Sequence, residues 1–94
     1  MQGSQSDAHL HNAEALLRGS LASHPQCPMA HNNLALVLVA RGRLSLGGGG
    51  GLAELYAGAD AALAEASRNA TAGSGLLRSA ERNRRLLGRL MQVQ

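Results

Sequence analysis

The residues of this chain that could carry out chemistry are one cysteine and four histidines. Cys27 could act as a nucleophile, or bind a metal as a thiolate, if a histidine stood beside it. His24 precedes it by three residues and His31 follows it by four, so a continuous helix would place all three on one face. Pro25 and Pro28 break such a helix. We therefore expect Cys27 to be an ordinary half-buried thiol near a turn.

The other two histidines, His9 and His11, are two residues apart. On a helix this spacing directs the two imidazole rings to different sides, which is poor geometry for a shared metal ion. The six acidic residues are scattered, and none pairs with a candidate nucleophile. We expect no catalytic residue, no metal site and no cofactor, and the chain is predicted not to be an enzyme.

A run of five glycines, Gly47–Gly51, could form either a phosphate-binding loop or a flexible linker. A Walker-type loop ends in Gly-Lys-Ser or Gly-Lys-Thr, and this chain contains no lysine. The dinucleotide fingerprint needs a preceding strand and a βαβ unit, and neither is evident. The run therefore predicts a flexible insertion near residues 45–51.

The length of 94 residues is enough for one domain with one modest core. Leucine and alanine supply most of the apolar residues, and Tyr56 is the single aromatic one, so the core is expected to be loosely specified. Arginine supplies all the basic charge: residues 1–66 hold three arginines and five acids, whereas residues 67–94 hold six arginines and one acid. The basic character thus belongs to the C-terminal segment.

The sequence also bears on the compartment. Residues 1–7 are polar and read as a disordered leader, without the basic and apolar regions of a secretory signal. The longest apolar run, residues 34–40, is far shorter than the roughly 20 residues that span a bilayer. A lone cysteine suits a reducing compartment. We expect a cytoplasmic protein, in which the Asn69-Ala70-Thr71 triplet would not be glycosylated.

The spacing of apolar residues predicts four helices, over residues 8–23, 28–41, 52–70 and 76–92. Pro25 ends the first, Pro28 suits the first turn of the second, and Gly42 is a natural residue to follow it. Ser74 is a candidate N-cap of the last helix. The apolar stretch 34–39 could equally be a buried strand, but its flanks favour a helix. The predicted fold class is all-α.

The last helix is the most clearly amphipathic. Leucines occupy one side, and four arginines occupy the other: Arg78, Arg82, Arg85 and Arg89. Arg84 lies on the apolar edge and would have to extend its charge towards water. A basic stripe of this kind could lie on a membrane surface or follow a phosphate backbone. More often it is the solvated side of a packed helix, and without interleaved aromatic residues we expect neither nucleic acid nor membrane as a partner.

Two residue patterns are found along the chain, one of them once and the other twice. In residues 29–44, a large residue, Leu, a small residue, a large residue and Gly follow at set offsets, as His31, Leu34, Ala35, Leu38 and Gly42. A small, a bulky and a small residue followed by Pro occur just before this stretch, as Ala13, Leu17, Ser20 and Pro25. The same pattern recurs behind it, with Thr in place of Pro, as Ala59, Leu63, Ala66 and Thr71. Residues 8–71 therefore resemble the tetratricopeptide-repeat (TPR) family, with about one and a half degenerate repeats.

This resemblance implies antiparallel helical hairpins, with the excess over one 34-residue repeat placed in the glycine-rich insertion. Residues 72–94 would provide the capping helix. The first helices of such repeats line a groove that holds a peptide or a partner helix. By resemblance, the groove residues here are Asn32, Asn33, Leu36 and Val39. Asn33 stands where some members bind a terminal carboxylate, but the lysine of that clamp is absent.

We therefore expect a non-enzymatic protein–protein interaction or scaffold module whose open apolar faces also allow self-association. The alternative is a small helical bundle whose arginine-rich C-terminal helix binds an anionic surface.

Overall fold

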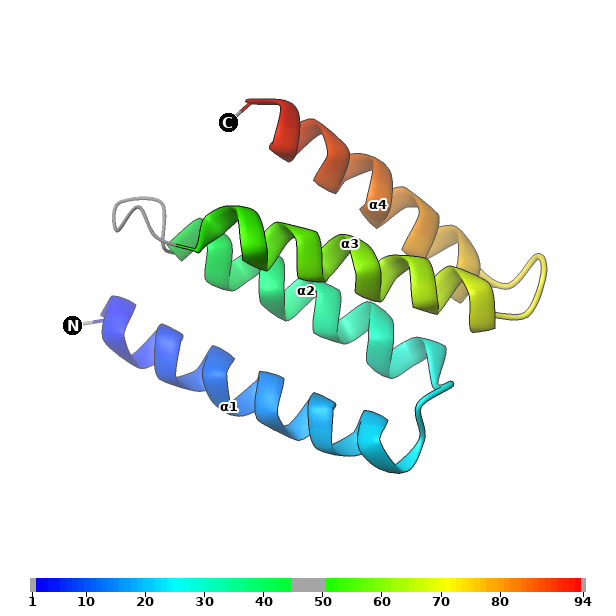
Figure 1. The fold of residues 1–94 in the computed structure, drawn as a ribbon, viewed down its shortest axis with the longest axis horizontal. Helices are drawn as coiled ribbons and strands as arrows, with labels where there is room; N and C mark the ends of the chain where they lie inside the picture. Colours follow the sequence, from blue (N-terminus) through cyan, green and yellow to red (C-terminus); the bar gives the residue numbers. More distant parts are fainter. Residues whose placement is uncertain (1, 45–50, 94) are drawn as a thin grey trace.

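The computed structural model describes residues 2–44 and 51–93, and over these residues it consists of four α-helices without strands (Figure 1). The helices are α1 (Gln2–Ser23), α2 (Pro28–Leu44), α3 (Leu52–Asn69) and α4 (Gly75–Val93). The predicted all-α fold class is confirmed. None of the described helices is both long enough and apolar enough to cross a membrane.

Two helix ends differ from the prediction. α1 begins at Gln2, six residues before the start at residue 8 that the sequence predicted. No proline occurs before Pro25 that would break this segment. Gln or Ser in a helix costs only about a few tenths of a kcal/mol per residue relative to alanine. α2 continues past Gly42 to Leu44, so Gly42 lies inside the helix. Of the predicted insertion near residues 45–51, all but Gly51 lies outside the described residues.

The structure explains why glycine stands at position 42. A Cβ atom there would lie 2.6 Å from Cε1 of Tyr56, which is 2% exposed. Glycine therefore lets the tyrosine ring pack directly against the α2 backbone. The single aromatic residue of the chain is thus packed where a glycine of α2 leaves room for its ring.

The core lies mainly between α2 and α3, and α4 adds Ala80 and Leu87 to it. Its members are predominantly alanine and leucine: Leu34, Ala35, Leu38, Tyr56, Ala59, Ala62, Leu63, Ala66, Ala80 and Leu87. Ala35, Ala59 and Ala66 are fully buried, and their small side chains let the helix axes approach closely. The alanine-rich composition is therefore a packing feature of the hairpin.

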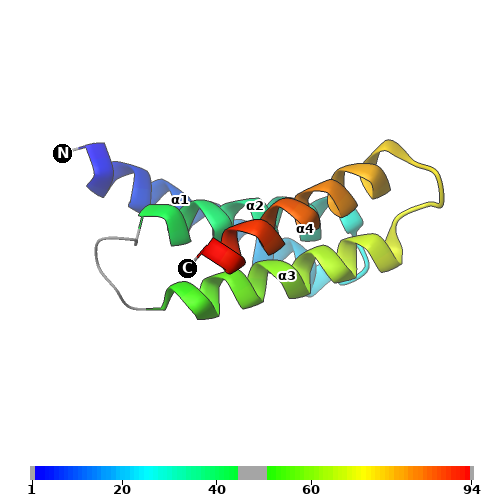
Figure 2. The ribbon, with the colours of Figure 1, turned by 90° about the horizontal axis from the view of Figure 1, so that it is seen from above.

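The helices form an open array. α1 contacts α2, α2 contacts α3, and α4 contacts both α3 and α2, but within the described residues α1 contacts neither α3 nor α4. Figure 1 shows α1 and α4 on opposite sides of the α2–α3 pair, and Figure 2 shows the same arrangement from above. One side of α2 is therefore left between α1 and α4 without a covering helix.

Polar contacts fix the outer helices. Glu14 of α1 accepts hydrogen bonds from Arg41 of α2 and, at 2.7 Å, from Arg18. Burial alone would raise the pKa of Glu14, but the hydrogen bonds and positive charges of the two arginines outweigh it and lower this pKa below its ordinary value. On the other side, Arg84 Nε of α4 lies 2.9 Å from Asp60 Oδ1 of α3. The arginine predicted on the apolar edge of the last helix thus pairs with a neighbouring helix.

The turn between α3 and α4 follows the predicted capping chemistry. Ser74 Oγ accepts a hydrogen bond of 3.1 Å from the backbone N–H of Leu77, as an N-cap side chain does. Gly73 has a φ of 78°, a conformation that glycine adopts without strain. This turn sets the direction in which α4 returns along α3.

Candidate functional site

α2 presents an apolar stripe away from the core. Leu34, Ala35 and Leu38 are buried, whereas Leu36, two positions from Leu34 and from Leu38, lies about 160° from both around the helix axis and faces outwards. Leu36 is 48% exposed and Leu44 is 49% exposed, and both line the same depression on the outer side of α2. Exposed leucines that adjoin one another are unusual enough to indicate a binding surface.

α4 completes a groove with this stripe. The α2–α4 groove has a volume of about 390 Å³ and is lined by Leu36, Val39, Arg43, Asn83, Leu86, Leu87, Arg89 and Leu90. Leu86 is 48% exposed, like Leu36 across the groove. The lining is therefore apolar at its base, carries two arginines, and contains no acidic residue.

A second depression lies on the other side of α2. It has a volume of about 430 Å³ and is lined by Leu10 of α1 together with Leu36, Val39, Ala40, Arg43 and Leu44 of α2. Leu36, Val39 and Arg43 line both depressions. The outer side of α2 is thus an apolar ridge with a hollow on each flank.

The four residues predicted to line a groove have different positions. Leu36 and Val39 do line the α2–α4 groove. Asn32 is only 6% exposed, and its Oδ1 accepts a hydrogen bond of 3.2 Å from Asn83 Nδ2 of α4. It holds α4 against α2 and is not available to a partner. Asn33 is exposed but is not among the residues that line the groove.

The α4 side of the groove was missed by sequence reasoning. The leucines of the last helix were predicted to form the apolar side of a capping helix, and Leu86 was not singled out as a binding residue. The structure covers Leu87, at 2% exposure, but leaves Leu86 half exposed. The sequence signal that could have revealed the exposure of Leu86 is the width of the leucine face of α4, which is wider than one neighbouring helix can bury.

The arginines of α4 lie on its exposed side, as predicted for Arg78, Arg82, Arg85 and Arg89. Arg78 Nη1 donates a hydrogen bond of 2.8 Å to the Gly73 carbonyl oxygen, so it helps to fix the turn. Arg89 lines the groove, and Arg82, one heptad earlier, lies within about 20° of it around the helix. The basic face therefore borders the groove directly.

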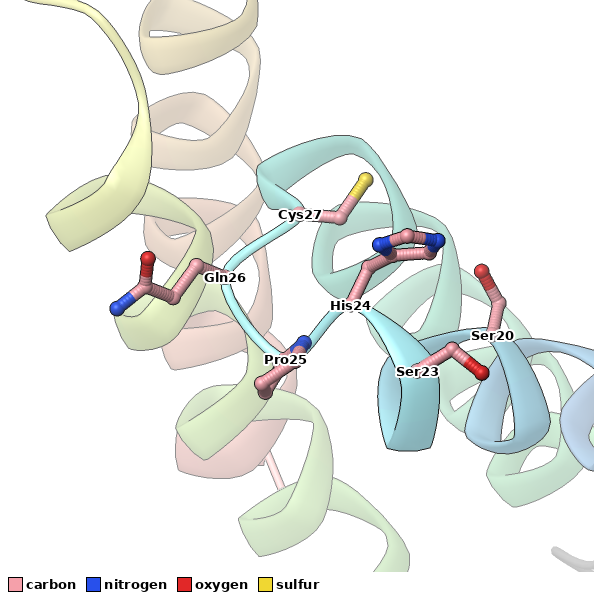
Figure 3. Close-up of a pocket in the computed structure, with 6 residues that line it drawn as sticks. All are labelled: Ser20, Ser23, His24, Pro25, Gln26 and Cys27. Atoms are coloured by element: carbon pink, nitrogen blue, oxygen red, sulfur yellow. The ribbon is translucent and has the colours of Figure 1, made fainter.

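The histidine–cysteine cluster lies at the turn between α1 and α2 (Figure 3). The depression there, of about 630 Å³, is lined by Ser20, Ser23, His24, Pro25, Gln26 and Cys27. The His24 ring and the half-buried Cys27 thiol lie on the same side of the turn (Figure 3). The His31 ring bonds instead to the Pro25 carbonyl oxygen, with Nε2 at 2.8 Å. Among the described residues, no three His, Cys, Asp or Glu side chains are grouped so that they could hold a metal ion.

Comparisons with known proteins give no family for this chain: no family model, curated protein or solved structure matches it.

Proposed function

We propose that this protein is a non-enzymatic interaction module that binds a peptide or helix of a protein partner in the α2–α4 groove. The observation that carries this proposal is the pair of half-exposed leucines, Leu36 and Leu86, which face one groove from two helices. Both side chains remain partly in water, so a partner that covered them would gain free energy from burying this apolar surface.

The open order of the helices supports a TPR-like architecture as part of this proposal. Each helix packs on its neighbours in the chain, and α1 does not close onto α4 within the described residues. Six of the eight residues that carry the family pattern in α2 and α3 lie in the core, among them Leu34, Ala35, Leu63 and Ala66. An array of this kind leaves an extended surface for a partner. We place this activity in the cytoplasm, where a lone thiol such as Cys27 stays reduced.

Selection of peptides on the intact chain would test the proposal. A displayed library of short random peptides would be selected on the immobilised protein, and the selected peptides would be mapped by amide chemical shifts. We expect shifts to concentrate on α2 and α4 around Leu36 and Leu86. The double variant Leu36→Asn/Leu86→Asn should lose binding because it removes the apolar floor.

A matched control separates groove binding from general stickiness. Leu16 of α1 is 76% exposed and lines neither hollow, so Leu16→Asn should bind the selected peptides as the wild type does. Peptides that map elsewhere, or that bind the double variant unchanged, would refute the proposal.

The alternative function is binding of an anionic surface through α4. It is favoured by the exposure of Arg78, Arg82, Arg85 and Arg89 along one helix. Vesicles that contain phosphatidylserine and duplex DNA are the two probes for this alternative. Binding to either should vanish when salt is raised from about 50 to about 500 mM, whereas binding to apolar groove residues should persist.

A further inference from the structure

We infer that the occupant of the α2–α4 groove is an acidic amphipathic helix, with leucine-like anchors on one face and carboxylates beside them. This inference rests on the proposed function and specifies the chemistry of the partner. It follows from the charges around the groove, from the shape of its apolar floor, and from the pairing of the chain's own acids.

The charges around the groove all have one sign. Arg43 approaches it from α2 and Arg89 from α4, and Arg82 lies one heptad before Arg89 on the same edge. None of these three arginines takes part in an ion pair within the described part of the chain. Three unpaired guanidinium groups beside an apolar floor favour a partner that carries carboxylates next to its apolar residues.

The floor of the groove fits a helix. Leu36, Val39 and Arg43 follow one another at steps of three and four residues along α2, over about 10 Å. Leu86 and Leu90 form a second row, at a step of four residues, on α4. Two rows of side chains with helical spacing leave a channel into which a third helix can place residues i, i+4 and i+7.

A second copy of this chain is a poorer match for the same groove. Of the five acids whose side chains are described, Glu14, Asp60 and Glu65 already pair with arginines of their own chain. Only Glu54 and Glu81 lie outside these pairs, and they are on different helices. No helix among the described residues therefore offers a row of available carboxylates beside leucines.

Two synthetic helical peptides test this inference on the full chain. Both carry leucine at i, i+4 and i+7. One has glutamate and the other has lysine at the flanking positions, and both have blocked ends so that no terminal carboxylate is present. Fluorescence anisotropy measures Kd. The acidic peptide should bind at least about tenfold more tightly than the basic one. Its glutamates would form several partly exposed ion pairs with the arginines, whereas the lysines of the basic peptide would be repelled by them.

Arg89→Glu and Arg85→Glu form a matched pair of variants, with the same charge change on the same helix. Arg89→Glu should reduce or invert the preference for the acidic peptide, because Arg89 lines the groove. Arg85→Glu should preserve the preference, because Arg85 does not line it. Circular dichroism of both variants should match the wild type, since both side chains are exposed.

The outcomes separate this inference from the proposed function. Equal binding of both peptides at the groove, or tighter binding of the basic one, would overturn the acidic partner and leave the groove as a binding site. If neither peptide binds and no library peptide maps to the groove, the proposed function fails as well. Sedimentation that shows a dimer, which Leu86→Asn dissociates and the acidic peptide does not, would place a second copy in the groove and overturn the inference.

Discussion

α2 packs against α3 and α4 in opposite ways. Towards α3 it presents Ala35 and Gly42, whose small size lets Tyr56 and Leu63 reach the core with almost no exposed surface. Towards α4 its contact includes a hydrogen bond between two amides, and leucine and valine side chains beside it stay accessible. The first interface is closed and apolar, whereas the second is tied at one point and open beyond it.

This difference shows how one helix can serve stability and binding at once. The buried face supplies the free energy of folding, and the outer face keeps apolar surface in reserve for a partner. The two faces are separated by less than half a turn of α2. Substitutions on them should therefore affect different measurements.

The largest effect is expected at the closed interface. Leu63→Ala removes a side chain that is 1% exposed and leaves a cavity among neighbours that cannot fully collapse. The free energy of unfolding should fall by about 2–5 kcal/mol. Chemical denaturation followed by circular dichroism measures this loss.

Leu36→Ala is the control for that prediction, since it makes the same chemical change on the open side of α2. Because Leu36 is half exposed, this substitution should cost less than about 1 kcal/mol and should mainly weaken peptide binding. Equal losses of stability for the two variants would mean that the two faces of α2 are not distinct.

The next effect concerns two glycines inside helices. Gly42→Ala brings a Cβ to 2.6 Å from the Tyr56 ring, so the ring or α3 must move, and the free energy of unfolding should fall by about 1–3 kcal/mol. Gly88→Ala meets no atom within 4 Å and should raise it by about 0.5–1 kcal/mol, because alanine favours the helix. Thermal unfolding of the two variants should therefore shift in opposite directions, and shifts of the same sign would contradict the close approach at Gly42.

The fold was largely predictable from the sequence because its signals are local. Proline, glycine and N-cap residues act on the backbone within a few positions of themselves, and Ser74 does cap α4 as predicted. Gly42 shows the limit of such signals. As a local signal it predicts a helix end, but α2 continues through it because Tyr56, fourteen positions further along the chain, needs the space.

The candidate site was only half predictable. Leu36 and Val39 were expected in a groove from the resemblance to the first helices of TPR repeats, and both line the α2–α4 groove. The leucines of α4 that stay exposed are determined by the angle at which α4 packs on α2 and α3. No local sequence pattern sets that angle. Asn32 illustrates the same point. Its polarity suggests a surface residue, but its amide is buried against Asn83 of another helix.

That amide pair provides a way to alter the open interface alone. Asn83→Ala leaves the buried Oδ1 of Asn32 without its hydrogen bond, which should cost about 1–2 kcal/mol in the free energy of unfolding. Asn33→Ala, one residue along on the exposed side, should change it by less than about 0.5 kcal/mol. If denaturation finds no difference between the two variants, the pair does not hold α4 in place.

The smallest effect is expected at the contact between α1 and α2, and it depends on pH. The folded state lowers the pKa of Glu14 below its ordinary value of 4.5, so as the pH falls the unfolded chain takes up a proton there before the native chain does. The stabilisation is therefore complete above about pH 4.5 and is lost as the pH falls through the lowered native pKa.

Because the ion pair of Glu14 is partly solvated, it should contribute less than about 1 kcal/mol to the free energy of unfolding. Wild type should exceed Glu14→Gln in stability at neutral pH, and the two should converge in acid. A difference that persisted at pH values where both states are protonated would show that Glu14 acts by packing and not by charge.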